Sequence, residues 1–255
     1  MFVRNEDFRS FLRNYPVVSV IIAINLLVFV IINFVPPLND LLYRMMAQQN
    51  ILVKQGDYWR LITPIFLHTG FAHVLFNSFW TVLFAPALER ILGKGKFIIA
   101  YLLTGIIGNI ATVFLQEPML ISYGASGAIF GLFGIFIYMV LFRKDLIDGP
   151  SSQIVIAIVI FSLISTFLTP QVNVVAHLFG LIGGLLLGPP LLARVPMNFS
   201  WQPSTIRRSG HYQNTDIAFK PDRWRKHQKR KAITKKIVWG LLGLFILFGL
   251  ISAIF

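Results

Sequence analysis

A serine between two glycines stands at the head of an apolar run, in the stretch Gly124-Ala125-Ser126-Gly127. In a membrane helix such a hydroxyl usually bonds back to a carbonyl one turn earlier, and the glycines usually serve close helix packing. A serine nucleophile, however, needs a base within hydrogen-bond reach. A second apolar run begins with Ala176-His177 and offers an imidazole. The pair indicates acyl transfer, with Ser126 attacking and His177 moving the proton.

The composition is that of a membrane protein. The chain has 255 residues, of which 56% are hydrophobic, and it contains no cysteine. A soluble domain is about 45–50% apolar, so the excess indicates the membrane. The length fits one polytopic domain with little room for a separate soluble domain. Without cysteine the chain can have no disulfide scaffold, no thiolate zinc site and no cysteine nucleophile.

Seven apolar runs approach or reach the length that crosses a membrane, about 20 residues per helix. They cover residues 17–35, 66–88, 97–116, 120–142, 153–169, 172–193 and 237–255. The first run exceeds the apolar core of a signal peptide, about 7–15 residues, so we expect an uncleaved helix. Leu38, Leu41 and Met45 recur at helical spacing and predict a short amphipathic helix in the interface. Trp59 and Arg60 follow, an aromatic–cation pair suited to headgroup depth.

The net charge of +13 is unevenly distributed. Residues 194–236 carry twelve Lys or Arg against two Asp, so most of the excess is one juxtamembrane cluster. The positive-inside rule then predicts that this stretch and the N-terminus are cytoplasmic and that the C-terminus is outside. A basic segment beside a membrane also suits anionic lipid headgroups. We therefore expect membrane lipids as partners, with anionic lipids at the basic linker, and no nucleic acid.

Ser126 and His177 share one side and one depth of the membrane in this arrangement. On helices that begin near Met119 and Val172, they would lie about 10 Å and about 8 Å below the outer boundary. Small residues recur every three or four positions on both helices, which lets two backbones approach closely. These rows are Gly127, Gly131 and Gly134 on one helix and Ala176, Gly180, Gly184 and Gly188 on the other. An ionisable residue inside a membrane helix is a functional hypothesis by default.

The second helix adds two polar residues, His73 and Asn77, one turn apart on one face. Burying them is costly unless they have a task. Acyl transfer supplies one, because its tetrahedral intermediate needs donors that already point at the oxyanion. The His73 imidazole, the Asn77 amide and the backbone N–H of Ser126 would serve as these donors. For Asn77 alone, an interhelical hydrogen bond is the competing interpretation.

No Asp or Glu lies in the helices of Ser126 and His177, so no residue orients the imidazole as a triad aspartate would. The sequence therefore predicts a Ser–His dyad. Phe130 lies one turn after Ser126 and could pack against the imidazole, although ordinary helix packing explains it equally well.

These residues closely resemble those of the rhomboid intramembrane serine proteases, over residues 59–193. The shared motifs are Trp59-Arg60, His68-x4-His73-x3-Asn77, Glu89-Arg90 with Gly93, Gly124-Ala125-Ser126-Gly127, and Ala176-His177-x2-Gly180-x3-Gly184. The resemblance implies that Ser126 is the nucleophile and His177 the general base and acid. It implies an oxyanion hole made by His73, Asn77 and the Ser126 amide, with Gly124 shaping the loop before the nucleophile.

The resemblance extends to supporting positions. Family members commonly have an aromatic residue, often tyrosine, where this chain has Phe130. Phe76 matches a residue where the second helix meets the mobile fifth helix, the proposed lateral gate. Its partner on that helix is Phe161 or Phe167, and the sequence does not decide between them. The role of His68 is also left open.

The fold implied is an all-α membrane protein, a rhomboid-like six-helix bundle with a seventh C-terminal transmembrane helix, in the six-plus-one arrangement of bacterial members. Its parts are a cytoplasmic N-terminal segment (1–16), the catalytic domain (17–193), the basic cytoplasmic linker (194–236) and the seventh helix (237–255). No cofactor or metal is implied. Substrates would be transmembrane proteins with Gly, Pro or polar residues near the outer end of the segment and a small residue before the cut. The active site would lie near the outer face.

Three other functions compete with this one. A metalloprotease would use His68, His73 and His177 as zinc ligands, but a spacing of five does not put the first two on one helix face, and no HExxH motif occurs. A non-catalytic rhomboid-like protein would bind membrane helices without turnover, and the intact dyad argues against it. A transporter would need broken helices near the midplane and usually an internal repeat, and the sequence shows neither.

Overall fold

The structure is a computed structural model and describes residues 1–196, except positions 3, 5 and 171. The predicted seventh helix (237–255) and nearly all of the basic linker (194–236) lie outside the described residues. The regular secondary structure of the described part is helical apart from one pair of two-residue strands, β1 (Gln48–Gln49) and β2 (Ile121–Ser122). The predicted all-α class is confirmed.

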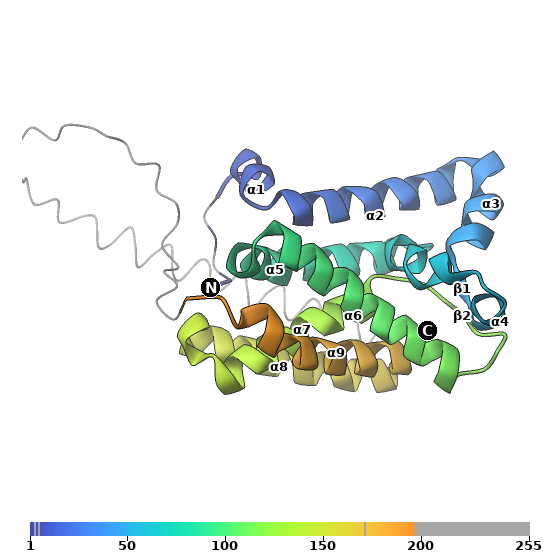
Figure 1. The fold of residues 1–255 in the computed structure, drawn as a ribbon. Coiled ribbons are helices and arrows are strands. Elements are labelled where there is room, and N and C mark those ends of the chain that lie inside the picture. Colours follow the sequence, from blue (N-terminus) through green and yellow to red (C-terminus); the bar gives the residue numbers. More distant parts are fainter. Residues whose placement is uncertain (3, 5, 171, 197–255) are drawn as a thin grey trace, which may run out of the picture. The chain divides into compact units, whose positions relative to one another are not determined.

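Six apolar helices make up the bundle. The five that are long enough to cross a membrane are α2 (Pro16–Phe34), α5 (Phe71–Leu92), α6 (Lys94–Leu115), α8 (Gly149–Leu168) and α9 (Val174–Leu192). The sixth, α7 (Ser126–Phe142), is shorter and contributes eleven buried residues to the core. In Figure 1, α2 runs along one side of the bundle, α7, α8 and α9 lie on the other, and α5 and α6 lie between them.

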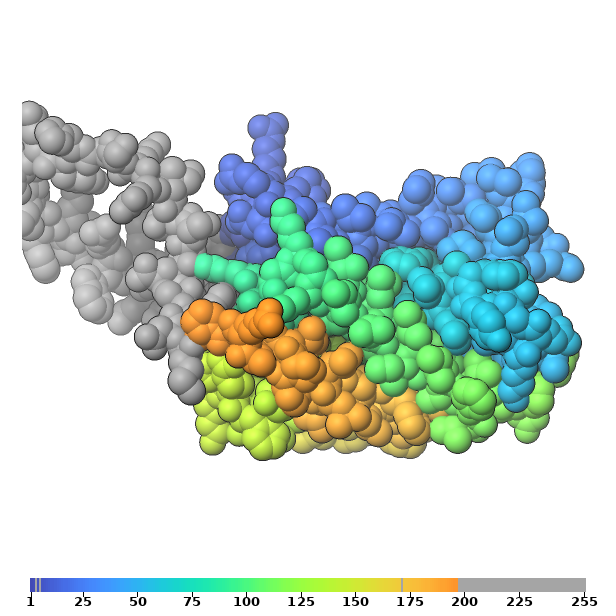
Figure 2. All heavy atoms as spheres, in the orientation of Figure 1, coloured from blue at the N-terminus to red at the C-terminus, as the bar shows by residue number. Residues whose placement is uncertain are grey.

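Shorter elements cover the ends of these helices. The segment between α2 and α5 fills one end of the molecule, drawn from light blue to cyan in Figure 2. β1 of this segment pairs antiparallel with β2, Gln48 opposite Ser122, and so joins it to the loop before α7. The short helices are α1 (Phe8–Asn14), α3 (Pro36–Met46) and α4 (Asn50–Lys54), with 3₁₀ turns at Tyr58–Leu61, Thr63–Phe66 and Lys144–Leu146. The predicted amphipathic helix is present as α3.

Two helices begin later than the sequence predicted. α7 begins at Ser126 instead of near Met119, because residues 120–125 form β2 and a loop. α9 begins at Val174, two residues after the expected start. The predicted depths of Ser126 and His177, about 10 Å and about 8 Å, were counted along helices from Met119 and from Val172. Because the helices begin later, these two depths are wrong. Ala125, just before α7, is fully buried, so the helix begins inside the protein.

Charged side chains near helix ends complete the backbone hydrogen bonds of neighbouring helices. The carboxylate of Glu89 on α5 accepts the N–H groups of Val17 and Val18, at 3.1 and 2.9 Å, and so caps the start of α2. Arg143, which follows α7, donates to the carbonyl of Leu192 at the end of α9, at 2.7 Å. Such terminal groups have no partner within their own helix. Glu89, a residue of the shared motifs, thus joins α2 to α5.

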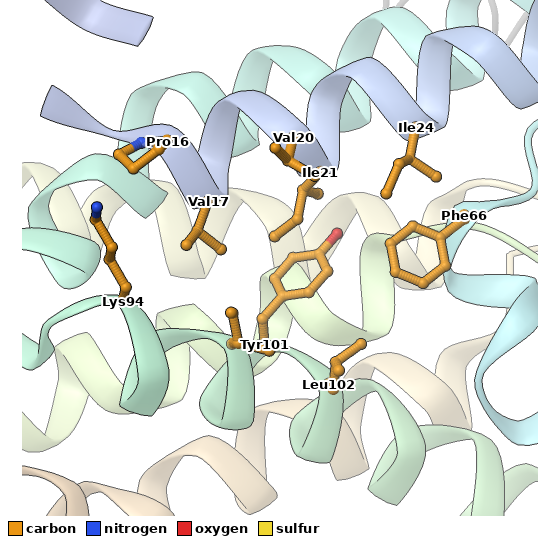
Figure 3. A pocket seen from close by; sticks show the side chains of 10 residues that line it. Pro16, Val17, Val20, Ile21, Ile24, Phe66, Lys94, Tyr101 and Leu102 are labelled. Carbon is orange, nitrogen blue, oxygen red and sulfur yellow. The ribbon is translucent and has the colours of Figure 1, made fainter. Parts of the chain in front are cut away.

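A cavity of about 380 Å³ lies between α2 and α6 (Figure 3). Its walls are apolar apart from Lys94 at one end and the hydroxyl of Tyr101, which faces Ile21 and Phe66. Neither Ser126 nor His177 lines it. The cavity therefore holds no pair of groups suited to acyl transfer, and the candidate site lies elsewhere.

Candidate active site

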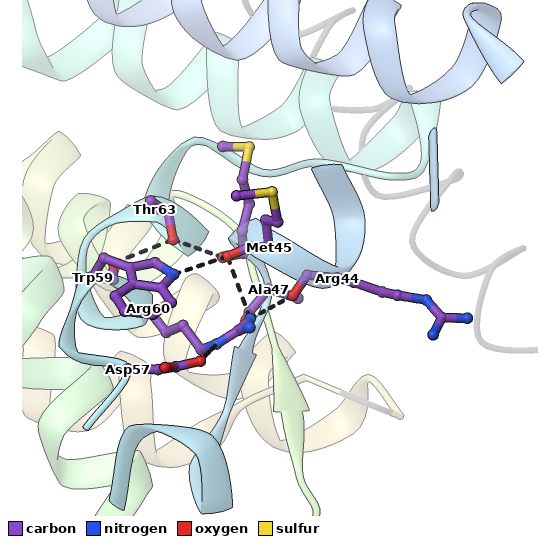
Figure 4. Close-up of polar contacts among 8 residues, drawn as sticks. Arg44, Met45, Ala47, Asp57, Trp59, Arg60 and Thr63 are labelled. Carbon is purple, nitrogen blue, oxygen red and sulfur yellow. Dashed lines mark hydrogen bonds and ion pairs between the residues drawn. The ribbon is translucent and has the colours of Figure 1, made fainter. Parts of the chain in front are cut away.

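Trp59 and Arg60 hold together the segment that precedes α5 (Figure 4). Nη1 of Arg60 donates to the carbonyl of Arg44 at 2.5 Å, and its Nε pairs with the carboxylate of Asp57 at 2.9 Å. Nε1 of Trp59 donates to the carbonyl of Met45 at 3.2 Å. Both carbonyls belong to the last turn of α3 and lack intrahelical partners. Arg60 is only 7% exposed, so it acts as an internal clamp rather than a headgroup contact.

Asn173 fixes the start of α9 relative to the strand that leads to the loop before Ser126. Its Oδ1 accepts the N–H of Ala176 at 2.9 Å, as a side chain at a helix N-cap does. Its Nδ2 donates to Oγ of Ser122 at 2.9 Å and to Oγ1 of Thr112 at 3.0 Å. The first turn of α9, which carries His177, is therefore tied to β2 and to α6.

Gly124 shapes the loop before Ser126 for two physical reasons. Its φ is +121°, a region that residues with a Cβ rarely adopt. A Cβ at this position would also lie 2.6 Å from Nε2 of His73. The N–H of Gly124 donates to the carbonyl of Pro64 at 2.8 Å and anchors the loop. The chain can pass His73 this closely only where it has no side chain.

His68 supports the same loop. Its Nδ1 lies 3.3 Å from the carbonyl of Phe66, and its Nε2 accepts the N–H of Ala125 at 3.4 Å. An accepting nitrogen carries no proton, so these contacts fit the neutral ring with its proton on Nδ1. Burial of the ring, together with the nearby His73, lowers the pKa of His68 to about 3, which keeps the ring neutral. His68, whose role the sequence left open, positions the residue before Ser126.

Ser126 is the first residue of α7 and is half-buried. The first N–H groups of a helix have no partner within it. The first bond of this helix runs from the N–H of Ile129 to the carbonyl of Ala125, at 3.0 Å. Among the described residues, none accepts the N–H groups of residues 126–128. These groups therefore remain available to an anionic centre beside Ser126, at the positive end of the helix dipole.

His73 and Asn77 lie one turn apart on α5, as the sequence predicted. The ring of His73 lies beside those of His68 and Tyr123, with centroids 5.0 and 5.9 Å away. Asn77 is 5% exposed, and its Nδ2 donates to the carbonyl of His73 at 2.9 Å. This bond stays within α5, so the competing interpretation of an interhelical bond is wrong. A carboxamide has two donor hydrogens, and across the part of the chain that the structure describes only one of those of Asn77 has an acceptor.

His177 lies in the first turn of α9, is 8% exposed and contacts two residues from other helices. The ring of Phe130 stacks on the imidazole, with centroids 4.2 Å apart and planes at 15°. The Nδ1 atom lies 2.8 Å from Oγ1 of Thr166 on α8. The stacking predicted as one of two options for Phe130 is therefore present. No Asp or Glu lies in α7, α8 or α9, as the sequence indicated, but a hydroxyl that the sequence did not single out, that of Thr166, contacts the imidazole.

Ser126 and His177 occupy the first turns of two helices that touch. A Cβ on Gly180 of α9 would lie 3.0 Å from the carbonyl carbon of Gly127, and one on Gly184 would overlap the carbonyl of Gly131. The two helices therefore run parallel with backbones in contact. Within the described part of the chain, no hydrogen bond joins Ser126 to His177. Such bonds are often long in the absence of substrate and tighten when it binds.

A family model described as "Rhomboid domain" matches residues 55–194, which include every residue of the candidate site. The chain belongs to the rhomboid family. It is 48% identical over 189 residues to the "Putative rhomboid protease YdcA" of Bacillus subtilis, a match that covers 73% of this chain and 94% of that protein. It is 40% identical over 148 residues to the "Rhomboid protease GluP" of the same organism, over 57% of this chain and 28% of that protein. It is 31% identical over 150 residues to the "RHOMBOID-like protein 5" of Arabidopsis thaliana, over 58% of this chain and 48% of that protein.

Family membership and five helices of spanning length make this rhomboid a multi-pass membrane protein. The chain spans nearly all of the first relative and less than half of the other two. Phe76, the predicted gate residue of α5, is half-buried. Its two candidate partners on α8, Phe161 and Phe167, are 39% and 63% exposed, and the choice between them stays a prediction.

Sequence reasoning missed several contacts of this site, and the bond between Thr166 and His177 is one of them. Thr166 stands in an apolar run without any motif around it, so its spacing carries no signal. Only the packing of α8 on α9 brings its hydroxyl to the imidazole of His177.

Proposed function

We propose that this rhomboid is an intramembrane serine endopeptidase, which hydrolyses peptide bonds in or near transmembrane segments of membrane proteins. The observation that carries the proposal is the stack of Phe130 on His177. Phe130 lies one helical turn after Ser126 on α7, and Ser126 is half-buried. The stack supports the proposal because it restrains the imidazole against the helix that begins with Ser126. Two of the similar proteins are named as rhomboid proteases, which supports the same reaction.

In the proposed reaction, Oγ of Ser126 attacks the carbonyl carbon of the scissile peptide bond. Nε2 of His177 takes the hydroxyl proton, and the carbonyl oxygen becomes negatively charged. The C–N bond then breaks as His177 gives the proton to the leaving amine, which leaves an ester on Ser126. A water molecule gives a proton to His177, attacks the ester and releases the acid product, and the proton returns to Ser126.

The negative oxygen of the intermediate needs donors that are already in place. The proposed donors are the N–H of Ser126, the second amide hydrogen of Asn77 and the imidazole of His73. The first two have no acceptor among the residues that the structure describes. His73 and Asn77 stand on α5 and Ser126 on α7, so the intermediate would be held between two helices. The positive end of the α7 dipole adds to its stabilisation.

The proposed substrates carry a transmembrane segment with Gly, Pro or polar residues near its outer end. A helical peptide bond is screened by its own turn, so the segment must unwind before Ser126 can reach it. The proposed active site opens toward the extracytoplasmic face, with residues 1–16 on the cytoplasmic side. The proposed division of the chain continues with the catalytic domain (17–193), a linker (194–236) that binds anionic lipid, and a seventh helix (237–255).

The test is cleavage of a single-span membrane substrate by the purified full-length protein in detergent. Wild type should cleave it, and Ser126→Ala and His177→Ala should fall to background. Ser126→Ala should melt at the wild-type temperature, whereas His177→Ala should remain folded but melt lower, because it removes a buried, stacked ring. Wild type, but not Ser126→Ala, should also be labelled by a fluorophosphonate. Full cleavage by Ser126→Ala would refute the mechanism. Substrate binding without turnover by wild type would establish the alternative, a non-catalytic rhomboid-like protein that captures membrane helices.

A further inference from the structure

We infer that Thr166 of α8 is a positioning residue for His177. It holds the imidazole in the tautomer that can act as a base, and it makes that state depend on α8 remaining packed on α9. The inference rests on the proposed function, because it concerns the base of that reaction. Neither the shared motifs nor the predicted dyad includes Thr166.

The direction of the hydrogen bond follows from the number of protons available. Oγ1 of Thr166 lies 2.8 Å from the carbonyl of Ser162, which can only accept, so the single hydroxyl proton points there. Toward His177 the same oxygen must therefore accept, and Nδ1 at 2.8 Å must carry the proton. A neutral imidazole protonated on Nδ1 has its lone pair on Nε2. Nε2 is the nitrogen that takes the proton of the serine in a Ser–His pair.

The two neighbours of His177 restrain different motions of its ring. The stack with Phe130 fixes the plane of the imidazole, with 15° between the two rings. A rotation of the ring by 180° about its Cβ–Cγ bond keeps that plane but puts Cδ2 in the place of Nδ1. The hydrogen bond to Thr166 removes this second freedom, because only a nitrogen can donate to Oγ1. Together they define one orientation of the base.

Thr166 thus orients the imidazole, which is one of the two roles of a triad aspartate. An aspartate orients the histidine and also stabilises the imidazolium that forms during the reaction. No Asp or Glu lies in α7, α8 or α9. Thr166 is 3% exposed, and a carboxylate buried at this position would carry a large desolvation cost. A hydroxyl provides the orientation without that cost, but it gives the imidazolium less stabilisation.

The link between the base and α8 follows from how little of α8 is buried. Only four residues of α8 are buried, and they form one stripe that faces the protein: Ser151, Val155, Val159 and Thr166. By comparison, α7 has eleven buried residues. Thr166 is the polar member of this stripe near the C-terminal end of α8. A displacement of that end away from α9 would separate Oγ1 from Nδ1. His177 would then lose the contact that favours its Nδ1 tautomer.

Two substitutions at Thr166 isolate the hydroxyl. Thr166→Val removes it at nearly the same volume, and Thr166→Ser keeps it. We expect Thr166→Val to lower kcat about 10- to 100-fold, the range of a positioning effect on general base catalysis, with little change in KM. Thr166→Ser should restore most of the wild-type kcat. The matched control is Thr104→Val, which removes a fully buried hydroxyl that lies nearest the carbonyl of Ala100, with those of Tyr101 and Ala128 farther away. No hydrogen bond joins this hydroxyl to His177 in the described ranges, so its loss should leave kcat unchanged.

Nitrogen NMR of histidine-labelled protein gives a readout that does not depend on turnover. His177 of wild type should carry its proton on Nδ1, and Thr166→Val should show a mixture of both tautomers. A wild-type His177 protonated on Nε2, or a Thr166→Val enzyme with wild-type kcat, would overturn the inference. If wild type neither cleaves substrate nor reacts with a fluorophosphonate, the proposed function fails, while the tautomer measurement still decides whether Thr166 orients the ring.

Discussion

Phe130 and His177 lie face to face, with ring centroids 4.2 Å apart and planes at 15°. The two residues come from α7 and α9, which touch along their glycine rows. Phe130 follows Ser126 by one helical turn, so a single face of α7 presents the hydroxyl and supports the imidazole. The relative position of the proposed nucleophile and base therefore depends on one helix–helix contact.

The first prediction concerns this stack. Aromatic pairs contribute about 0.5–1.5 kcal/mol beyond the burial of their area, so losing the stack should lower kcat about 2- to 10-fold. Phe130→Leu keeps an apolar side chain without the ring and should show this loss. Phe130→Tyr keeps the ring and should retain wild-type kcat. Steady-state cleavage assays measure both, and equal kcat for Phe130→Leu and wild type would show that the stack has no catalytic role.

The second prediction concerns the loop before Ser126. Gly124→Ala would need a Cβ at φ +121° and within 2.6 Å of Nε2 of His73, so the loop must move. We expect cleavage and fluorophosphonate labelling to fall at least 100-fold, because a displaced nucleophile loses its alignment. Gly95→Ala is the control, since a Cβ there meets nothing within 4 Å, and it should behave as wild type. Labelling of Gly124→Ala at the wild-type rate would contradict the prediction.

The order of the helices and the glycine rows along which α7 and α9 touch could be predicted from the sequence. Apolar runs of spanning length are a local signal, and glycines repeated every three or four residues mark close backbone approach. The beginning of α7 could not be predicted in this way. Residues 120–125 continue the apolar run, but their backbone pairs with β1 and turns at Gly124. Hydropathy does not distinguish a buried loop from the first turns of a helix.

The neighbours of the site residues are long-range contacts, and this is why most of them were missed. His68 and Ala125 are 57 positions apart, and the motif that contains His68 does not indicate that it accepts the N–H of Ala125. Thr166 and His177 are 11 positions apart but belong to different helices. The stacking of Phe130 was predictable as one of two options, because it shares a helix face with Ser126.

The third prediction is a pH dependence of stability. The pKa of His68 is lowered by burial and by His73 from its ordinary value of 6.5 to about 3, so between these values the unfolded chain binds a proton that the folded protein does not. Protonation of His68 in the unfolded chain favours unfolding, so the free energy of unfolding falls as the pH decreases from 6.5 toward 3. Above pH 6.5 the ring is neutral in both states, and the stability is not reduced by this residue. His68→Gln cannot titrate and should lose less stability than wild type between pH 7.5 and pH 4.5. Denaturant titrations at the two pH values measure this difference, and identical losses in both proteins would contradict it.

The fourth prediction separates stability from catalysis at Glu89. Its carboxylate accepts the N–H groups of Val17 and Val18, and it is 3% exposed. Glu89→Ala would leave these helix-start donors without a partner, which costs about 1–3 kcal/mol for a buried group. Glu89→Gln keeps one accepting oxygen and should lose less stability than Glu89→Ala. The melting temperature should therefore be highest for wild type, lower for Glu89→Gln and lowest for Glu89→Ala.

Catalysis should not follow this ranking. Glu89 lies sixteen residues after His73 on α5, or about 24 Å along the helix, so its loss should not reach the proposed oxyanion donors directly. Well below the melting temperature, we expect Glu89→Ala to keep kcat within about twofold of wild type, as surface and capping changes away from a site do. A large fall in kcat at unchanged melting temperature would show that the contact between α2 and α5 acts on the site, and the assignment of Glu89 as a purely structural cap would then be wrong.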